Sequence, residues 1–373
     1  MLTGLPTLTM RGHRTVSTDR ARLGELVAAV LAGSWRALPP RLNIHEREIG
    51  EITPLLLGSG SASLAWWRIR CDDVSTSPAV QGLKQAYLLH TLRAAVHERD
   101  TVAAISTLRS AGVEPLLIKG WAVARLYPKR GLRPYGDMDV LIGLPQQRAA
   151  RLALATVPRL STPIDLHTHL DPLDRRGIDD LYAHSRPARL GDVEVRVLGP
   201  EHQLRLLCLH LLKHGGRRPL LLCDVGLMLE SVPRDFDWDY CLGADPLCAN
   251  WVVSVLRLAH EILGARLDSA PEGVRGRVLP DWVVPEVLRQ WGTGMDSYLM
   301  HIEGYLRHPS AIPRGVRRWW PNGLDATVRF RIPIDEMPIL SLQAARFLEL
   351  AITLPARVVR RGASLGAAAL HSR

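Results

Sequence analysis

Four short apolar runs, separated by helical or turn-rich sequence, lie between residues 113 and 198 of this 373-residue chain. They cover residues 113–118, 138–142, 163–170 and 193–198, and each has the length and composition of a strand. The sequence between them predicts helices at 120–127 and 146–157, with a polar loop at 128–136. Strands that alternate with helices in this way predict a small α/β unit.

Helical patterns flank this unit on both sides. Upstream, apolar residues recur mostly at three- and four-residue spacing, and after Pro200 the strand patterns stop. We therefore expect a helical N-terminal segment (1–80), an α/β core (81–200) and a helical C-terminal domain with a basic tail (201–373). Helices are predicted at residues 21–31, 63–70, 77–112, 201–214, 220–229, 248–263, 282–291 and 340–354.

Composition excludes several classes of protein. The apolar fraction of 47% and the charged fraction of 23% are those of a globular chain and argue against general disorder. No apolar run approaches the roughly 20 residues that span a bilayer, and the first residues lack the pattern of a secretory signal. The five cysteines are odd in number and form no CxxC pair, which argues against a disulfide framework or a structural zinc site. We expect a cytoplasmic protein with free thiols.

The positive charge is unevenly distributed. The formal net charge is +10, and residues 301–373 carry 11 arginines against five acidic residues, which is most of that excess. A chain that binds nucleic acid is expected to place its positive charge along the binding face of its core, so a nucleic-acid partner is the less attractive reading. Only four of the 47 basic residues are lysines, so a lysine inside a motif is notable.

Two carboxylates open the second predicted strand. Asp137 and Asp139 stand two residues apart, so the period of a strand places both on one face, with Met138 and Val140 on the other. Asp165 alternates in the same way on the third predicted strand. If these strands are neighbours, three carboxylates converge, and their charge requires compensation. Oxygen ligands suit Mg²⁺ or Mn²⁺, and three carboxylates suffice to hold two ions around a phosphoryl group.

Basic residues precede the acidic pair. Lys119 and Gly120 end the first predicted strand and begin a helix, where a glycine permits close backbone approach and free N–H groups can face a phosphate. Arg130 and Arg133, in the loop before Asp137, are candidates to hold further phosphate oxygens. An isolated Asp-x-Asp is a weak signal, since edge carboxylates commonly face water. The ordered set of Lys-Gly, Arg-x₃-Asp-x-Asp and Asp-x-His is much more specific.

Two histidine patterns leave other interpretations open. His167 and His169 form a His-x-His, which also opens zinc metallohydrolase barrels, although the helical character after residue 200 argues against the later strands of such a barrel. His210 and His214 are one helical turn apart, but no Glu completes a metalloprotease motif. Their helix face, with Lys213 as a phosphate or base contact, lies either near a nucleotide or in solvent.

The ordered set resembles the bacterial uncharacterised nucleotidyltransferase family, a branch of the DNA polymerase β-like nucleotidyltransferase superfamily. The resemblance is carried by EPLLIKGWAVARLYPKRGLRPYGDMDVLI (114–142) and IDLHTHL (164–170), and more loosely by residues 209–214 and 222–229. It implies an α/β (α+β) core with a small mixed sheet and flanking helices. It also implies Asp137, Asp139 and Asp165 as metal ligands and catalytic residues, Lys119-Gly120 where the wider superfamily has Gly-Ser, and His167 in the family's Asp-x-His pattern.

The activity implied by the resemblance is metal-dependent nucleotidyl transfer. An NTP such as ATP and Mg²⁺ or Mn²⁺ would be required, and the nucleotide would pass to a hydroxyl or other nucleophile with release of pyrophosphate. A small molecule or a peptide natural product is the expected acceptor. The competing interpretation is a nucleotide-binding protein that keeps the fold without turnover, and the intact set of three aspartates argues against it because buried carboxylates are costly to keep.

Overall fold

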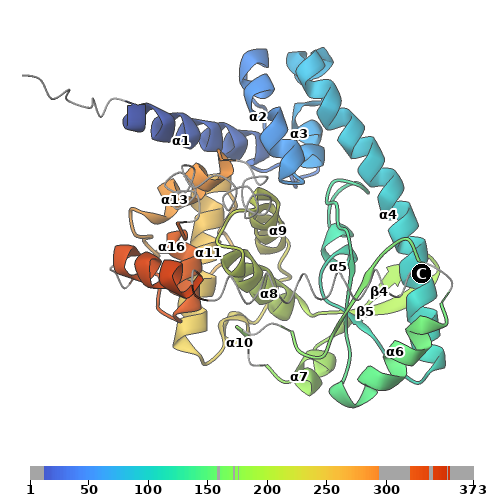
Figure 1. Cartoon of the computed structure of the whole chain (residues 1–373). Helices are drawn as coiled ribbons and strands as arrows, with labels where there is room; N and C mark the ends of the chain where they lie inside the picture. Colours follow the sequence, from blue (N-terminus) through green and yellow to red (C-terminus); the bar gives the residue numbers. More distant parts are fainter. Residues whose placement is uncertain are drawn as a thin grey trace, which may run out of the picture. The chain divides into compact units, whose positions relative to one another are not determined.

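The computed structural model describes residues 12–157, 160–170, 173–174, 176–293, 320–335, 339–350 and 352 (Figure 1). The chain divides into two compact units, residues 1–295 and 296–373. In the second unit, helix α16 (Gly323–Arg329) begins after Asn322, whose side chain accepts a hydrogen bond from the backbone N–H of Asp325. The basic tail predicted at the end of the chain lies outside the described residues.

A five-stranded mixed sheet forms the centre of the first unit. Its strands lie in the order β3-β2-β1-β5-β4. The pairs β2–β3 and β1–β5 are parallel, whereas β1–β2 and β4–β5 are antiparallel. The predicted mixed sheet with helical flanks is therefore confirmed. The strands are β1 (Leu116–Leu117), β2 (Met138–Leu141), β3 (Ile164–His167), β4 (Arg186–Leu190) and β5 (Val193–Val197).

Helices cover both faces of the sheet. On one face, α4 (Pro78–Ser110) and α6 (Gln147–Ala155) bury apolar side chains against Leu117, Val140 and Val195. On the other face, α7 (Ile178–Ala183) and α8 (Pro200–Lys213) pack against Leu116 and Leu141. Side chains alternate along β2, so Asp139 shares the face of Leu141 while Met138 and Val140 enter the opposite core.

Two groups of helices extend from this core. Upstream, α4 packs against α2 and α3, and downstream α8, α9 and α11 pack against one another. No helix among the described residues is both long enough and apolar enough to cross a membrane. The remaining elements are α1 (Gly12–Leu31), α2 (Glu46–Gly58), α3 (Ala62–Ile69), η1 (Asp73–Thr76), α5 (Trp121–Ala124), η2 (Leu144–Gln146), α9 (Pro219–Glu230), α10 (Trp238–Leu242), α11 (Pro246–Leu263), α12 (Glu272–Arg275) and α13 (Val283–Trp291).

Candidate functional site

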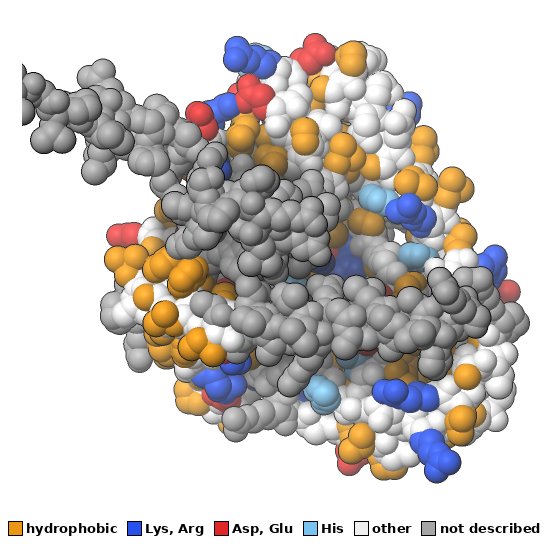
Figure 2. All heavy atoms as spheres, in the orientation of Figure 1, with side chains coloured by type: hydrophobic (Ala, Val, Ile, Leu, Met, Phe, Trp, Pro, Cys, Tyr) orange, Lys and Arg blue, Asp and Glu red, His pale blue; other side chains and the backbone are white. Residues whose placement is uncertain are grey.

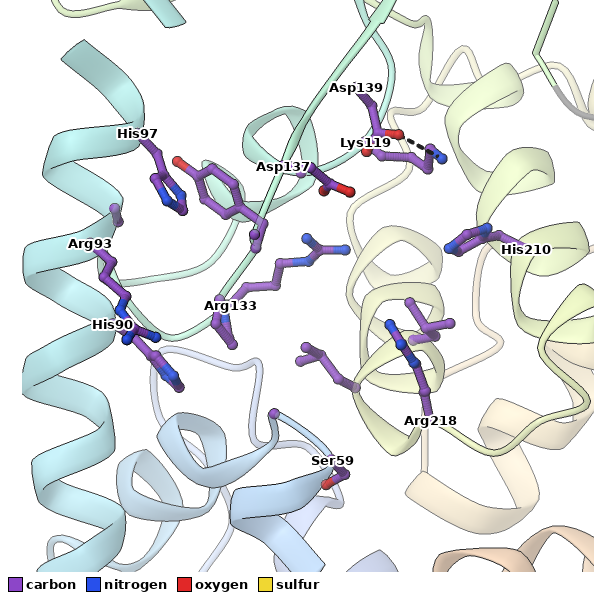
Figure 3. Close-up of a pocket in the computed structure, with 18 of the residues that line it drawn as sticks. Ser59, His90, Arg93, His97, Lys119, Arg133, Asp137, Asp139, His210 and Arg218 are labelled. Carbon is purple, nitrogen blue, oxygen red and sulfur yellow. Dashed lines mark ion pairs between the residues drawn. The ribbon is translucent and has the colours of Figure 1, made fainter. Parts of the chain in front are cut away.

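The site is built where β1 ends and β2 and β3 begin. The backbone N–H of Ile118 donates to the carbonyl oxygen of Asp139 (3.3 Å), so the chain leaving β1 delivers Lys119 beside that aspartate. The Lys119 Nζ lies 2.8 Å from Asp139 Oδ1 (Figure 3). In the parallel pair β2–β3, Asp139 is in register with Asp165. The neighbouring strands therefore place an ammonium group and two carboxylates at one position of the sheet.

His167 connects the two carboxylates. Its Nε2 atom lies 2.9 Å from Asp139 Oδ1 and 3.3 Å from Asp165 Oδ2. One ligand atom from each of Asp139, Asp165 and His167 falls within 4.8 Å of the others, and we call these three residues the acid–histidine group. Asp137 precedes β2 by one residue and lines a pocket that Asp139 and Asp165 also line. The structure thus brings together five of the site residues predicted from the sequence, counting Lys119.

The two aspartates of the Asp-x-Asp motif differ in their electrostatics. Burial opposes ionisation of Asp139, but the hydrogen bond with His167 and the charge of Lys119 lower the pKa of Asp139 to about 2. Burial and the neighbouring charge of Asp139 raise the pKa of Asp137 above its ordinary value. Asp139 is therefore firmly ionised at neutral pH, whereas Asp137 gains most from a cation placed beside it.

Gly120 permits the close approach of two backbone segments. Its φ is +52°, a backbone conformation that residues other than glycine rarely adopt. A Cβ atom at this position would lie 3.3 Å from the carbonyl oxygen of Asp137. Glycine is thus required for the turn that leads from Lys119 into α5 and runs past the start of β2.

The two carboxylates of the acid–histidine group, Asp139 and Asp165, line a pocket of about 580 Å³, a volume typical of small-molecule sites. Four parts of the chain line it: residues 58–60 at the turn from α2 to α3, one face of α4, the strand ends, and the connection of α8 to α9. Figure 2 shows histidine and Lys or Arg side chains gathered where the surface is hollowed next to α4. Two sides of the pocket carry cationic and imidazole side chains, and we call them the α4 wall (His90, Arg93, His97) and the α8–α9 wall (His210, His214, Arg218).

Three predicted phosphate contacts are placed differently. Arg130 forms an ion pair with Glu98 (2.6 Å), Lys213 is exposed at the end of α8, and neither lines the pocket. Arg133 does line the pocket, but its guanidinium is bound to the buried Asp224, with Nη2 2.9 Å from Oδ2. Arg130 and Arg133 are thus engaged by carboxylates, and Lys213 lies outside the pocket. The role of all three as phosphate contacts stays a prediction.

Asp224 is the centre of a buried polar network. The Tyr127 hydroxyl donates to Asp224 Oδ1 at 2.8 Å, and Arg133 donates through Nε and Nη2. Burial opposes the charge of Arg133, but Asp224 raises the pKa of Arg133 above its ordinary value. The network joins helix α9 to the loop that leads into Asp137.

The α4 wall was not predicted from the sequence. His90, Arg93 and His97 recur at helical spacing, but nothing in that spacing separates a pocket wall from a solvated helix face. The His90 Nδ1 atom lies 2.7 Å from the hydroxyl of Ser63, which is fully buried in α3. The pocket therefore depends on side chains from the N-terminal helices that only the tertiary structure brings into place.

The two histidines of the α8–α9 wall are held neutral. Burial, followed by the effect of His214 and Lys119, lowers the pKa of His210 to about 3. Burial and the cations Arg218, Lys213, Lys119 and Arg217 lower the pKa of His214 to about 4. Both rings face the pocket uncharged at neutral pH, and their centroids are 4.6 Å apart.

These histidines are expected to make the fold sensitive to acid. The unfolded chain takes up protons on them near pH 6.5, whereas the folded chain does so only near pH 4 and pH 3, so stability falls as the pH drops through this window. Each imidazole contributes a slope of up to about 1.4 kcal/mol per pH unit. In urea unfolding at pH 7 and pH 4.5, the His210→Gln/His214→Gln variant should lose less stability than the wild type. Replacing the exposed His169 by Gln is the control, and an equal loss in all three proteins would contradict the assignment.

A second acid–histidine cluster lies on α7, α8 and α10. Asp180, His184 and His202 place ligand atoms within 4.8 Å of one another around the Tyr240 hydroxyl. The Arg176 guanidinium, which has only donors, lies 2.8 Å from His202 Nδ1. That nitrogen must accept, so the proton of the neutral ring sits on Nε2, and His202 is arranged as a hydrogen-bond donor and not as a metal ligand.

Comparison with known proteins identifies a family for this arrangement. Residues 52–157 and 155–264 match the model of a family described as an uncharacterised nucleotidyltransferase. The two matches together cover more than half of the chain and include every part of the chain that lines the pocket. Among curated proteins none matches the chain, and among solved structures none does.

Proposed function

Because the chain belongs to the uncharacterised nucleotidyltransferase family, we propose that it transfers a nucleotidyl group from an NTP to an acceptor nucleophile and releases pyrophosphate. A small molecule or a peptide is the proposed acceptor. Asp137, Asp139 and Asp165 are the proposed ligands of Mg²⁺ or Mn²⁺. The observation that carries the proposal is the pairing of Asp139 with Asp165 across β2 and β3, with Lys119 alongside, in one pocket.

The donor set fits a divalent cation. The carboxylates of Asp137, Asp139 and Asp165 line the same pocket, and Mg²⁺ and Mn²⁺ prefer oxygen ligands of this kind. The electrostatics agree, because burial and then the charges of Asp139 and Asp165 raise the pKa of Asp137, and a cation beside it would favour its ionised form. When bound, the cation would supply charge neutralisation at the phosphoryl oxygens and acidify the acceptor hydroxyl.

The remaining chemistry is assigned to this chain's own side chains. The acceptor oxygen forms a bond to the α-phosphorus, the bond between the α-phosphorus and the bridging oxygen breaks, and pyrophosphate leaves. Asp165, whose side chain is 60% exposed, is reachable by the acceptor and takes the proton from its hydroxyl. Lys119 brings a positive charge to the phosphates beside Asp139.

The zinc hydrolase interpretation is disfavoured by two observations. His169, the second histidine of the His-x-His pattern, is exposed and lies outside the acid–histidine group. Past β5 the described residues form helices around an open sheet, and not the further strands of a barrel. Weak dependence on Mg²⁺ or Mn²⁺, in place of tightly held zinc, is the expected metal requirement.

Pyrophosphate release is the direct test. The full chain is incubated with each NTP in turn, with Mg²⁺ or Mn²⁺ and a panel of small alcohols and peptides, and pyrophosphate is measured with labelled nucleotide traced into product. We expect release that requires both the cation and an acceptor. Binding of NTP without release under any of these conditions would instead identify a nucleotide-binding protein of the same fold.

A further inference from the structure

We propose that the α8–α9 wall, formed by His210, His214 and Arg218 and extended by Lys119, binds the triphosphate of the NTP. The proposal rests on the function proposed above, since it names the part of the pocket that receives the nucleotide's charge. The proposed polyanion site is formed by His210, His214 and Arg218, and none of these three residues belongs to the ordered sequence motif.

The geometry of the wall supports an external ligand. His210 lies in the last turn of α8, His214 ends that helix, and Arg218 precedes α9, so one tight connection presents all three. Within the described part of the chain, none of the three side chains has a hydrogen-bond or ion-pair partner. Figure 3 shows His210 and Arg218 directed into the space that Lys119, Asp137 and Asp139 also face. The α8–α9 wall thus places hydrogen-bond donors on one side of the carboxylates.

The charge surrounding the two walls distinguishes them. Four cations, Arg218, Lys213, Lys119 and Arg217, contribute to lowering the pKa of His214, although the Asp139 carboxylate acts in the opposite direction on the pKa of His210. On the α4 wall, His97 is acted on by Arg93 but also by the carboxylates of Asp100 and Asp137. More cations therefore act on the histidines of the α8–α9 wall than on those of the α4 wall, where Arg93 is the cation that acts on both His90 and His97. A triphosphate carries several negative charges at neutral pH and is therefore expected to bind at the α8–α9 wall.

Lys119 connects the wall to the reacting centre. Its ammonium group contacts Asp139 and lies close enough to His210 and His214 to lower the pKa of both. A triphosphate bound along the wall would run from Arg218 toward Lys119 and bring its α-phosphorus to the carboxylates. The α4 wall is then left for the acceptor.

The test is the binding of inorganic tripolyphosphate to the full chain, measured by calorimetry without a divalent cation. Arg218→Gln is expected to weaken binding by about tenfold to a hundredfold, because a charged contact is lost, and Arg218→Lys to recover part of it. Two variants remove the same charge elsewhere: Arg217→Gln beside the wall and Arg93→Gln on the α4 wall. Both should change the affinity by less than about threefold.

Three outcomes would overturn the inference. Equal losses in Arg218→Gln and Arg217→Gln would show general electrostatic attraction only, and a larger loss in Arg93→Gln would move the polyanion to the α4 wall. Tripolyphosphate that binds without displacing an NTP would identify a site for a different anion. The proposed function fails separately: an enzyme that forms no pyrophosphate can still bind tripolyphosphate through Arg218, and one with full turnover can lack that dependence.

Discussion

Replacing Asp137 and Asp139 together by Asn is expected to lower the rate of pyrophosphate formation by about a thousandfold or more. Both side chains keep their shape but lose the charge that would hold a divalent cation, and several kcal/mol of transition-state stabilisation correspond to a loss of this size. The measurement is single-turnover pyrophosphate release at saturating NTP, together with Mn²⁺ affinity by titration. Both readouts should fall in the same variant.

The matched control is Asp192→Asn, which makes the same chemical change in the exposed turn between β4 and β5. It should leave turnover and Mn²⁺ affinity at wild-type values. Normal turnover by the Asp137→Asn/Asp139→Asn protein would show that these two aspartates are not catalytic, even if the fold and the pocket remained intact. Unchanged circular dichroism is required before a loss is assigned to catalysis.

Replacing Asp224 by Ala is expected to lower the free energy of unfolding by about 3–5 kcal/mol. Asp224 is fully buried, and its removal leaves the Arg133 guanidinium and the Tyr127 hydroxyl buried without their partner. Chemical denaturation followed by tryptophan fluorescence measures the loss. Activity should fall as well, since Arg133 anchors the loop that ends at Asp137.

A second ion pair provides the comparison. Glu98→Ala breaks the pair with Arg130, whose side chain is 54% exposed, and should cost less than about 1 kcal/mol. Converting the whole network to apolar residues (Asp224→Leu, Arg133→Met, Tyr127→Phe) should recover most of the lost stability, because no buried polar group is left unpaired. If Asp224→Ala and Glu98→Ala cost the same, the buried network would not be a major source of stability.

The strands that carry the site were predictable because their patterns are local. The runs that became β2 and β3 alternate carboxylates with apolar side chains, and pairing in register follows once the strands are neighbours. β4 was missed because RPARL contains a proline and two arginines. It is an edge strand, so its arginines can extend into solvent. Pro187 is tolerated there because an edge strand does not need every backbone N–H to donate to a neighbouring strand. Helix α2 was missed because Pro54 interrupts its pattern and because its N-cap residue is His45, which is outside the usual capping residues, although Glu48 accepts a hydrogen bond from the backbone N–H of His45.

The walls of the pocket were not predictable to the same degree. His210 and His214 were recognised as a pair, but whether their helix faced a nucleotide or solvent depended on how α8 packs beneath the sheet. Arg133 illustrates the opposite case, since its spacing from Asp137 suited a phosphate contact while a partner 91 residues away engages it. Partners so distant along the chain leave no periodic signal.

The pocket is assembled from parts of the chain that are far apart in the sequence, and this bears on how the protein can be divided. Residues 58–60 border the pocket, and Ser63 holds His90 in place on α4. A fragment that starts at residue 81 would keep the whole ordered motif and still lack this border. Grafting the motif onto another scaffold would likewise transfer the carboxylates without the cavity that surrounds them. The smallest working piece is therefore set by helix packing, and it extends well beyond the ordered sequence motif.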